Sequence, residues 1–160
     1  MAIQVKDNFL NDQEFEEIKN NIMGNNFPWF FYDYITNDND HIDNFYFIHN
    51  IFRQPSLVSG WFELFNNFLE KIEYKSLLRI KANLYLKTKN KVIHKPHKDY
   101  YYEHKGCILY INDNNGETFF GKEKVKPKAN RIVFFNPNEE HSSSTCTDQQ
   151  RRVNINFNYF

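Results

Sequence analysis

The second half of the chain is a series of short segments in which apolar and polar side chains alternate, separated by polar turns. In residues 79–86, one face of a strand would carry Arg79, Lys81, Asn83 and Tyr85, and the other Ile80, Ala82, Leu84 and Leu86. Further strands are expected at residues 107–111, 117–120, 132–135 and 153–160. Alternation with a period of two is typical of strands that bury one face. Residues 79–160 therefore predict an antiparallel β structure.

The first half is expected to add two helices and three strands. Residues 12–23 should form a helix, because Asn11 can cap it and Glu14 can complete a capping box. Apolar residues recur there at helical spacing: Phe15, Ile18 and Ile22. A second helix is expected at residues 59–72, strands at residues 5–10, 29–35 and 45–51, and a polar loop at residues 36–44. The fold class is thus mainly β (α+β), a barrel or sandwich such as a jelly roll, with N-terminal helices packed on one side.

Length and charge restrict the classes of function. The chain of 160 residues suits one domain spanning residues 1–160. Lysine plus arginine and aspartate plus glutamate both number 20, so no net charge attracts nucleic acid or anionic lipid. Cys107 and Cys146 form no CxxC pair, no signal-like apolar segment opens the chain, and none approaches the ~20 residues of a membrane span. We expect a soluble cytoplasmic protein for which nucleic acid and membrane are unlikely partners, and the oligomeric state stays open.

His97 and Asp99 are candidate metal ligands. Residues i and i+2 of a strand point to the same face, so these two side chains should project together. His141, which follows the strand expected at residues 132–135, is the best third ligand. Two histidines and one carboxylate form the facial triad that binds Fe(II) and leaves positions open for a co-substrate and O₂. His94 suggests a different metal set, but Pro96 disfavours one regular strand there, and we expect His94 at the rim.

Arg152 is the candidate anion-binding residue. A guanidinium is always charged and binds a carboxylate bidentately. On the last strand, alternation places four polar residues on one face: Arg152, Asn154, Asn156 and Asn158. A polar face inside a barrel suits a binding site, with Arg152 directed inward and Arg151 outward. The alternative is that both arginines are surface charges.

Together these motifs occur in the order seen in 2-oxoglutarate- and Fe(II)-dependent oxygenases. They are His97-Lys98-Asp99, Tyr110-Ile111-Asn112, the NGETFF sequence at residues 115–120, the RIVFF sequence at residues 131–135, His141, and Arg152-Val153-Asn154. The chain most resembles the prolyl-4-hydroxylase-like subgroup, including small phage-type members, over roughly residues 79–160. It departs from the family at Asn115-Gly116, where Gly-Gly is usual, and in a short loop at residues 100–106.

The resemblance implies a double-stranded β-helix that holds Fe(II) with His97, Asp99 and His141. It also implies that Arg152 binds the distal carboxylate of 2-oxoglutarate. Four further residues would contribute to the co-substrate pocket: Tyr110, whose hydroxyl would support the same carboxylate, Thr118, Tyr85 and Asn154. The implied reaction uses O₂ and 2-oxoglutarate to hydroxylate an unactivated C–H bond. The substrate would be a prolyl residue of a peptide or protein, or alternatively a small molecule.

Two other classes of function stay open. A cupin-like metal-dependent isomerase or lyase would share the barrel, but the HxH pair of cupins is absent. A non-catalytic β-barrel binding protein would not need three ligands and an inward arginine. The entrance offers an apolar surface, because Tyr100, Tyr101, Tyr102 and the aromatic segment at residues 29–34 could line a groove for a peptide. We therefore expect an open, aromatic-lined mouth above the metal.

Overall fold

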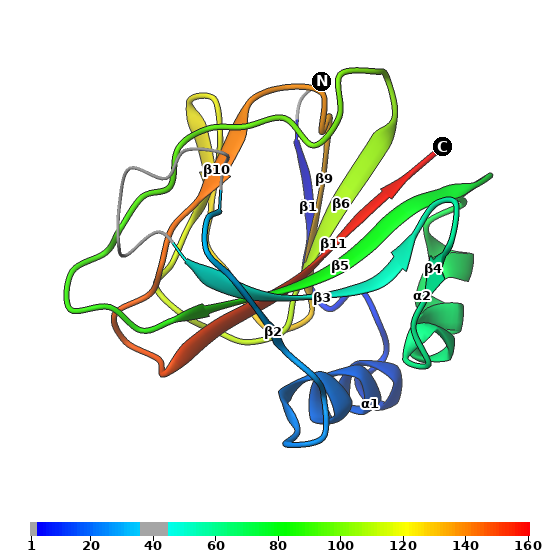
Figure 1. The fold of residues 1–160 in the computed structure, drawn as a ribbon, viewed down its shortest axis with the longest axis horizontal. Helices are drawn as coiled ribbons and strands as arrows, with labels where there is room; N and C mark the ends of the chain where they lie inside the picture. The colour runs from blue at the N-terminus through cyan, green and yellow to red at the C-terminus, as the bar shows by residue number, and fades with distance from the viewer. Residues whose placement is uncertain (1–2, 36–44) are drawn as a thin grey trace.

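The computed structural model describes residues 3–35 and 45–160, and in these residues it is mostly antiparallel β (Figure 1). The larger sheet has eight strands in the order β1-β9-β6-β11-β5-β3-β2, with β4 paired to β3, and the smaller has the order β10-β7-β8. The strands of the larger sheet are β1 (Gln4–Lys6), β2 (Phe30–Tyr32), β3 (Tyr46–Arg53), β4 (Leu57–Val58), β5 (Leu77–Leu86), β6 (Lys105–Tyr110), β9 (Arg131–Phe135) and β11 (Arg151–Tyr159). Those of the smaller sheet are β7 (Thr118–Phe120), β8 (Glu123–Val125) and β10 (His141–Ser143).

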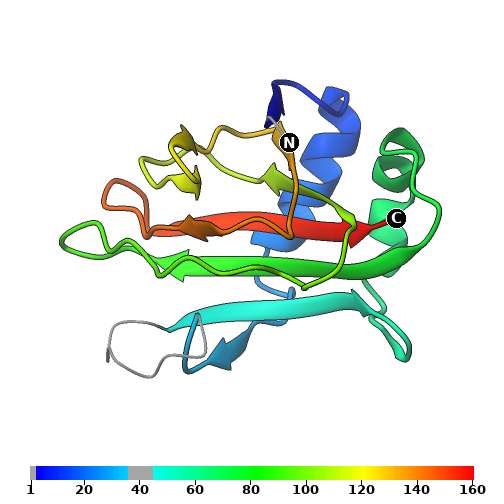
Figure 2. The same ribbon diagram turned by 90° about the horizontal axis from the view of Figure 1, so that it is seen from above.

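Strands β5 and β11 pair along their whole length and run side by side through the molecule (Figure 2). The alternation predicted for β11 is confirmed. Its apolar residues belong to the main hydrophobic core: Val153, Ile155, Phe157 and Tyr159. Its polar residues lie on the opposite face, which is turned toward the smaller sheet. One strand therefore serves the core with one face and a polar cavity with the other.

Both helices cover the apolar face of the larger sheet (Figure 1). Helix α1 (Asp12–Met23) begins at the predicted Asn11 cap, and the capping box with Glu14 is present. The second helix is divided into a 3-10 turn, η1 (Phe62–Phe65), and the short helix α2 (Asn66–Lys71). The prediction of one continuous helix was wrong there. Short 3-10 turns are frequent at the N-terminus of an α-helix, and here the α-helical part begins only at Asn66.

The smaller sheet packs against the end of the larger sheet that carries β6 and β9. A second hydrophobic cluster joins the two sheets, and its members are Ile108, Tyr110, Val125, Val133 and Phe135. The short strands β4, β8 and β10 were not predicted, and the loop predicted at residues 36–44 lies outside the described residues. Within the described ranges, every helix is too short or too polar to cross a bilayer.

Candidate active site

A polar cavity lies between the two sheets. From the larger sheet it is lined by Lys81, Asn83, Tyr85, Arg152, Asn154 and Asn156. From the smaller sheet it is lined by Thr118, His141, Ser142 and Ser143, and His97 closes one end. The register of β5 with β11 arranges the polar residues as four cross-strand rungs: Tyr85/Arg152, Asn83/Asn154, Lys81/Asn156 and Arg79/Asn158. The polar faces predicted for these two strands therefore line one side of the same cavity.

The three predicted metal ligands converge. One donor atom from each of His97, Asp99 and His141 lies within 4.8 Å of the other two. The expected reason was wrong, because His97 and Asp99 do not share a regular strand. His97 forms only an isolated bridge with His141, with N–H···O distances of 2.9 and 3.0 Å, and Asp99 N donates to the Pro137 carbonyl. Pro96 has no N–H for a strand ladder, so the backbone is held at single points.

The donor set fits a divalent metal such as Fe(II). The Nδ1–H of His141 donates to the Glu139 carbonyl, which leaves Nε2 free at 3.9 Å from Asp99 Oδ2. The Nδ1 of His97 is buried without a hydrogen-bond partner. Burial lowers the pKa of His97 to about 4, and His141 acts in the same direction, so the ring is neutral at pH 7, as a metal ligand must be. These side chains carry the nitrogen and oxygen donors of a facial triad.

Asp99 is held by side chains from β5 and β11. Arg79 donates to Oδ1, while Asn156 and Asn158 donate to Oδ2 at 3.0 and 2.9 Å. Burial alone would raise the pKa of Asp99, but the positive charge of Arg79 and the neighbouring His141 and Lys81 outweigh it and lower this pKa below its ordinary value. The sequence left the direction of Arg79 open and gave no role to the two asparagines. The polar alternation of β5 and β11 was the signal that placed them on this face.

Arg152 lies at the other end of the cavity and is fully buried. Its Nη1 donates to the Ser144 carbonyl at 2.6 Å and its Nη2 to Thr118 Oγ1 at 2.8 Å, while Nε has no partner. Its guanidinium carbon lies 5.2 Å from the centre of the Tyr85 ring. Across the described part of the chain, no carboxylate pairs with it. A buried cation without an anion is costly, so this position is suited to an anionic ligand.

Tyr110 lies behind Thr118, outside the residues that line the cavity, and its contact with the co-substrate carboxylate stays a prediction. Its hydroxyl donates to Thr118 Oγ1 at 2.8 Å, and Thr118 rather than Tyr110 lines the cavity. Tyr110 thus supports the residue that holds Arg152. Tyr85 and Asn154 line the cavity.

Unpartnered polar atoms concentrate around this cavity. Apart from Trp29 Nε1, the buried side-chain atoms without a partner in the described residues are Asn83 Oδ1, Asn156 Oδ1, Arg152 Nε, His97 Nδ1 and His94 Nε2. The rim position expected for His94 was wrong, because its ring is buried, stacks on Tyr85 and contacts Ser143 Oγ at 2.8 Å. Buried polar groups are normally satisfied, so this concentration is the pattern expected of a site that binds a polar ligand.

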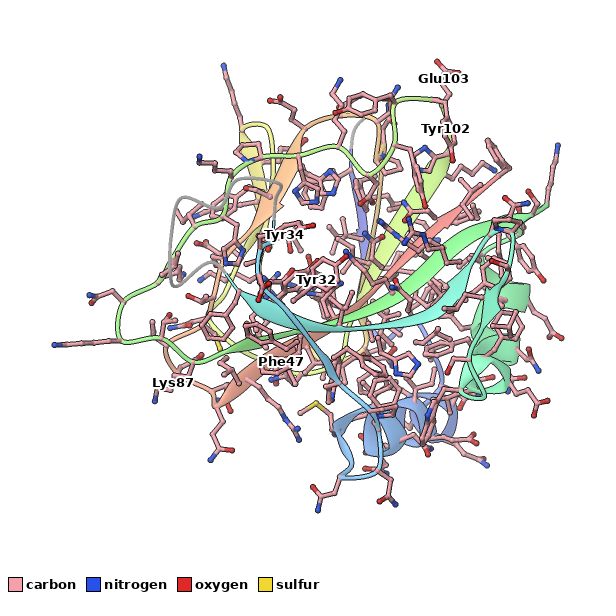
Figure 3. All side chains as sticks on the ribbon, in the orientation of Figure 1. Tyr32, Tyr34, Phe47, Lys87, Tyr102 and Glu103 are labelled. Atoms are coloured by element: carbon pink, nitrogen blue, oxygen red, sulfur yellow. The ribbon has the colours of Figure 1, made fainter. Side chains whose placement is uncertain are left out.

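An open outer pocket lies on the other side of the triad. Its charged and polar lining consists of Arg79, Lys81, His97, Lys98, Asp99 and Glu140. The aromatic mouth expected from the sequence is found only in part. Tyr101 lines this pocket, but Tyr100 and Tyr102 stack on each other and line a separate hollow beside Pro55. Figure 3 shows Tyr102 at the upper edge of the molecule, away from Tyr32 and Tyr34.

Comparison with known proteins gives structural matches only. No protein-family model matches the sequence, and no curated protein does. A 2OG-Fe(II) oxygenase family protein from Burkholderia pseudomallei matches 98% of this chain and 84% of its own, with 13% identity and a TM-score of 0.71. A prolyl-4-hydroxylase from Pseudomonas putida matches 98% of this chain and 91% of its own, with 11% identity and a TM-score of 0.58. The chain therefore has the fold of 2OG-Fe(II) oxygenases, a prolyl-4-hydroxylase among them.

Proposed function

We propose that this protein is a 2-oxoglutarate- and Fe(II)-dependent oxygenase that hydroxylates an unactivated C–H bond. One observation carries the proposal. Two histidines of a His-Asp-His triad line the same cavity as a fully buried arginine that has no carboxylate partner in the described residues. The shared fold supports the same function. In this proposal the two sheets form a double-stranded β-helix. Residues 1–160 form one such domain in this proposal.

The residues have distinct roles in this proposal. His97, Asp99 and His141 hold Fe(II), and Arg152 binds the distal carboxylate of 2-oxoglutarate with Thr118 beside it. When bound, the metal and co-substrate supply the oxidising chemistry that uses O₂. The protein fixes both by charge and hydrogen bonds, and it encloses the co-substrate between two sheets away from water. We assign no general base to the proposed reaction.

The substrate and setting are finer parts of the same proposal. A prolyl residue in a peptide or protein is the first candidate, since a neighbour in structure is named as a prolyl-4-hydroxylase. Two buried, unpaired cysteines, Cys107 and Cys146, suit a reducing cytoplasm.

The test is binding of metal and co-substrate, followed by turnover. Purified protein is loaded with Fe(II) without oxygen and titrated with 2-oxoglutarate, and a weak visible charge-transfer band is expected. In air, succinate should form. His97→Ala should remove metal binding and the band while circular dichroism shows an unchanged fold, and His49→Gln, at a histidine of β3 that contacts Pro28 and Ser59, is the control.

The same measurements separate the other classes. A cupin-like isomerase or lyase would bind metal without consuming 2-oxoglutarate. A non-catalytic barrel would form no succinate in air. If fully metal-loaded protein shows neither the band nor succinate, the proposed function is wrong.

A further inference from the structure

Lys81 lies where the inner cavity meets the outer pocket. Of the described residues, only Ile35, Lys81 and His97 line both. Lys81 follows Arg79 on the same face of β5, and its cross-strand partner Asn156 donates to Asp99. The ammonium is thus placed beside the triad, on the side open to an incoming substrate.

Lys81 makes few interactions within the described part of the chain. Its ammonium makes one long hydrogen bond, 3.5 Å, to the Tyr46 hydroxyl, and it lies 5.6 Å from the centre of the same ring. Within residues 3–35 and 45–160, no carboxylate pairs with it, because Asp99 is bound by Arg79 and two asparagines. Burial lowers the pKa of Lys81 to about 7, Arg79 and Arg53 act in the same direction, and Asp99 opposes them. A carboxylate beside the ammonium would raise this pKa again.

The position is separate from the one at Arg152. The cross-strand pairs Lys81/Asn156 and Tyr85/Arg152 are separated by one further pair on the same face, which puts them roughly 13 Å apart along the strands. The Arg152 guanidinium is anchored to Thr118 and Ser144, whereas Lys81 contacts Tyr46 from β3. The two cations therefore define two anion positions rather than one shared clamp.

Charge balance indicates what fills the second position. In the proposed enzyme, a divalent metal and dianionic 2-oxoglutarate cancel, and Asp99 cancels Arg79. Among the described residues that line the two pockets, this count leaves an excess of two positive charges, those of Arg152 and of protonated Lys81, because the exposed Lys98 and Glu140 of the outer pocket cancel each other. A neutral substrate would leave this excess in place, whereas an anionic one would complement it.

We propose that the primary substrate presents a carboxylate, and that Lys81 binds it beside the metal position. This proposal rests on the proposed function and narrows its class of substrate. Whether or not it contains a prolyl residue, the substrate carries a negative charge at the end that enters the site. Lys81 is the group that selects it. The side chain thereby gains in the complex a carboxylate partner that none of the described residues supplies.

The test compares ligands that differ only in this charge. Protein loaded with Zn(II), which supports no turnover, and saturated with 2-oxoglutarate is titrated with matched carboxylate and amide pairs. The pairs are N-acetyl-L-proline, N-acetylglycine and N-acetyl-L-leucine, each with its carboxamide. Calorimetry or NMR should show at least one carboxylate binding about ten-fold or more tightly than its amide. Lys81→Met should abolish this preference, and Lys81→Arg should retain much of it.

Lys87 supplies the matched control, since it follows β5, is exposed and lies at the far end of that strand (Figure 3). Lys87→Met should leave the preference unchanged. A melting temperature separates ligand binding from a structural role. Removing an unpaired, partly buried charge should leave the free protein as stable or more stable, so a clear fall in the melting temperature of Lys81→Met would overturn the proposal.

The remaining outcomes are decisive as well. If wild-type protein prefers no carboxylate over its amide, or if Lys81→Met keeps the preference, the proposal is wrong. It is equally wrong if Lys81→Met weakens only 2-oxoglutarate binding, because Lys81 would then serve the co-substrate. Failure of wild-type protein to bind Zn(II) and 2-oxoglutarate would count against the proposed function. The same ligand pairs titrated into unloaded protein would then still test Lys81.

Discussion

Arg79 and Asp99 form a buried ion pair that ties the start of β5 to the segment carrying two of the three candidate metal ligands. The side chain of Asp99 is only 2% exposed, so water does not replace a lost partner. Because Asp99 lies outside any regular strand, this pair and the two asparagines on β11 hold its carboxylate in place.

The first prediction follows from this pair. Arg79→Met leaves a buried carboxylate without its counter-ion and should lower the free energy of unfolding by about 3 kcal/mol. The double variant Arg79→Met with Asp99→Asn should recover much of this loss, because the buried charge is gone. Urea unfolding of both variants, with the exposed Arg53→Met as control, measures the effect. Asp99→Asn alone completes the double-mutant cycle, and a loss in the double variant equal to the sum of the two single losses would show that the pair is not coupled.

The two arginines of β11 should behave differently. Arg152→Met removes the buried cation of the cavity and should weaken 2-oxoglutarate binding to metal-loaded protein by 100-fold or more. Arg151 donates to the Met23 carbonyl, on the helix side of the sheet, so Arg151→Met should change the affinity less than two-fold. Calorimetric titration gives both constants. Similar losses in the two variants would contradict the assignment of Arg152.

Gly116 controls the position of Arg152. A Cβ at this residue would lie 2.7 Å from Arg152 Cδ and 2.8 Å from Asn114 Oδ1, so both side chains must move. Gly116→Ala should therefore weaken 2-oxoglutarate binding roughly ten-fold while metal affinity stays unchanged. At Gly60 a Cβ meets nothing within 4 Å, which makes Gly60→Ala the matched control. A loss of metal affinity in Gly116→Ala would indicate a wider distortion than this contact predicts.

Acid should weaken the link between the loop after β1 and β9. The side chains of Arg131 and Lys128 bind Asp7 and lower its pKa to about 2 from 3.8. A depressed carboxyl pKa stabilises the fold fully above the unfolded value, near pH 4, and this contribution disappears as the pH falls through about 2. Asp7 is largely exposed, so we expect about 1 kcal/mol or less after solvent screening. Urea unfolding of wild type and Asp7→Asn should differ at pH 6 and converge near pH 2.

The sequence predicts much of this site because strand alternation is a local rule. The face shared by Arg152, Asn154 and Asn156 follows from spacing alone, and it lines the cavity. The partners of Asp99 do not follow in this way. Arg79 is 20 residues away and Asn158 is 59 residues away in the chain. Only the register of β5 with β11, which a single sequence does not specify, brings them together.

The sequence correctly predicts that the side chains of His97 and Asp99 lie together, but the reason expected for it was wrong. An i, i+2 relation would have placed them on one strand face, yet the bridge to His141 and the contact with Pro137 orient them. The strand β10, which carries His141, has three residues and lacks the apolar alternation that reveals longer strands. His94 was misplaced because burial against Tyr85 depends on tertiary packing.

The two faces of β11 link the folding of this protein to its site. A slip of one residue in its pairing with β5 would turn Arg152 and three asparagines into the apolar core and Phe157 into the cavity. The free-energy cost of burying those polar groups excludes that register. The apolar residues of β11 therefore fix the direction in which its polar residues point. Molecules with an intact core should then also possess an aligned site, and partial loss of function through register errors should be rare.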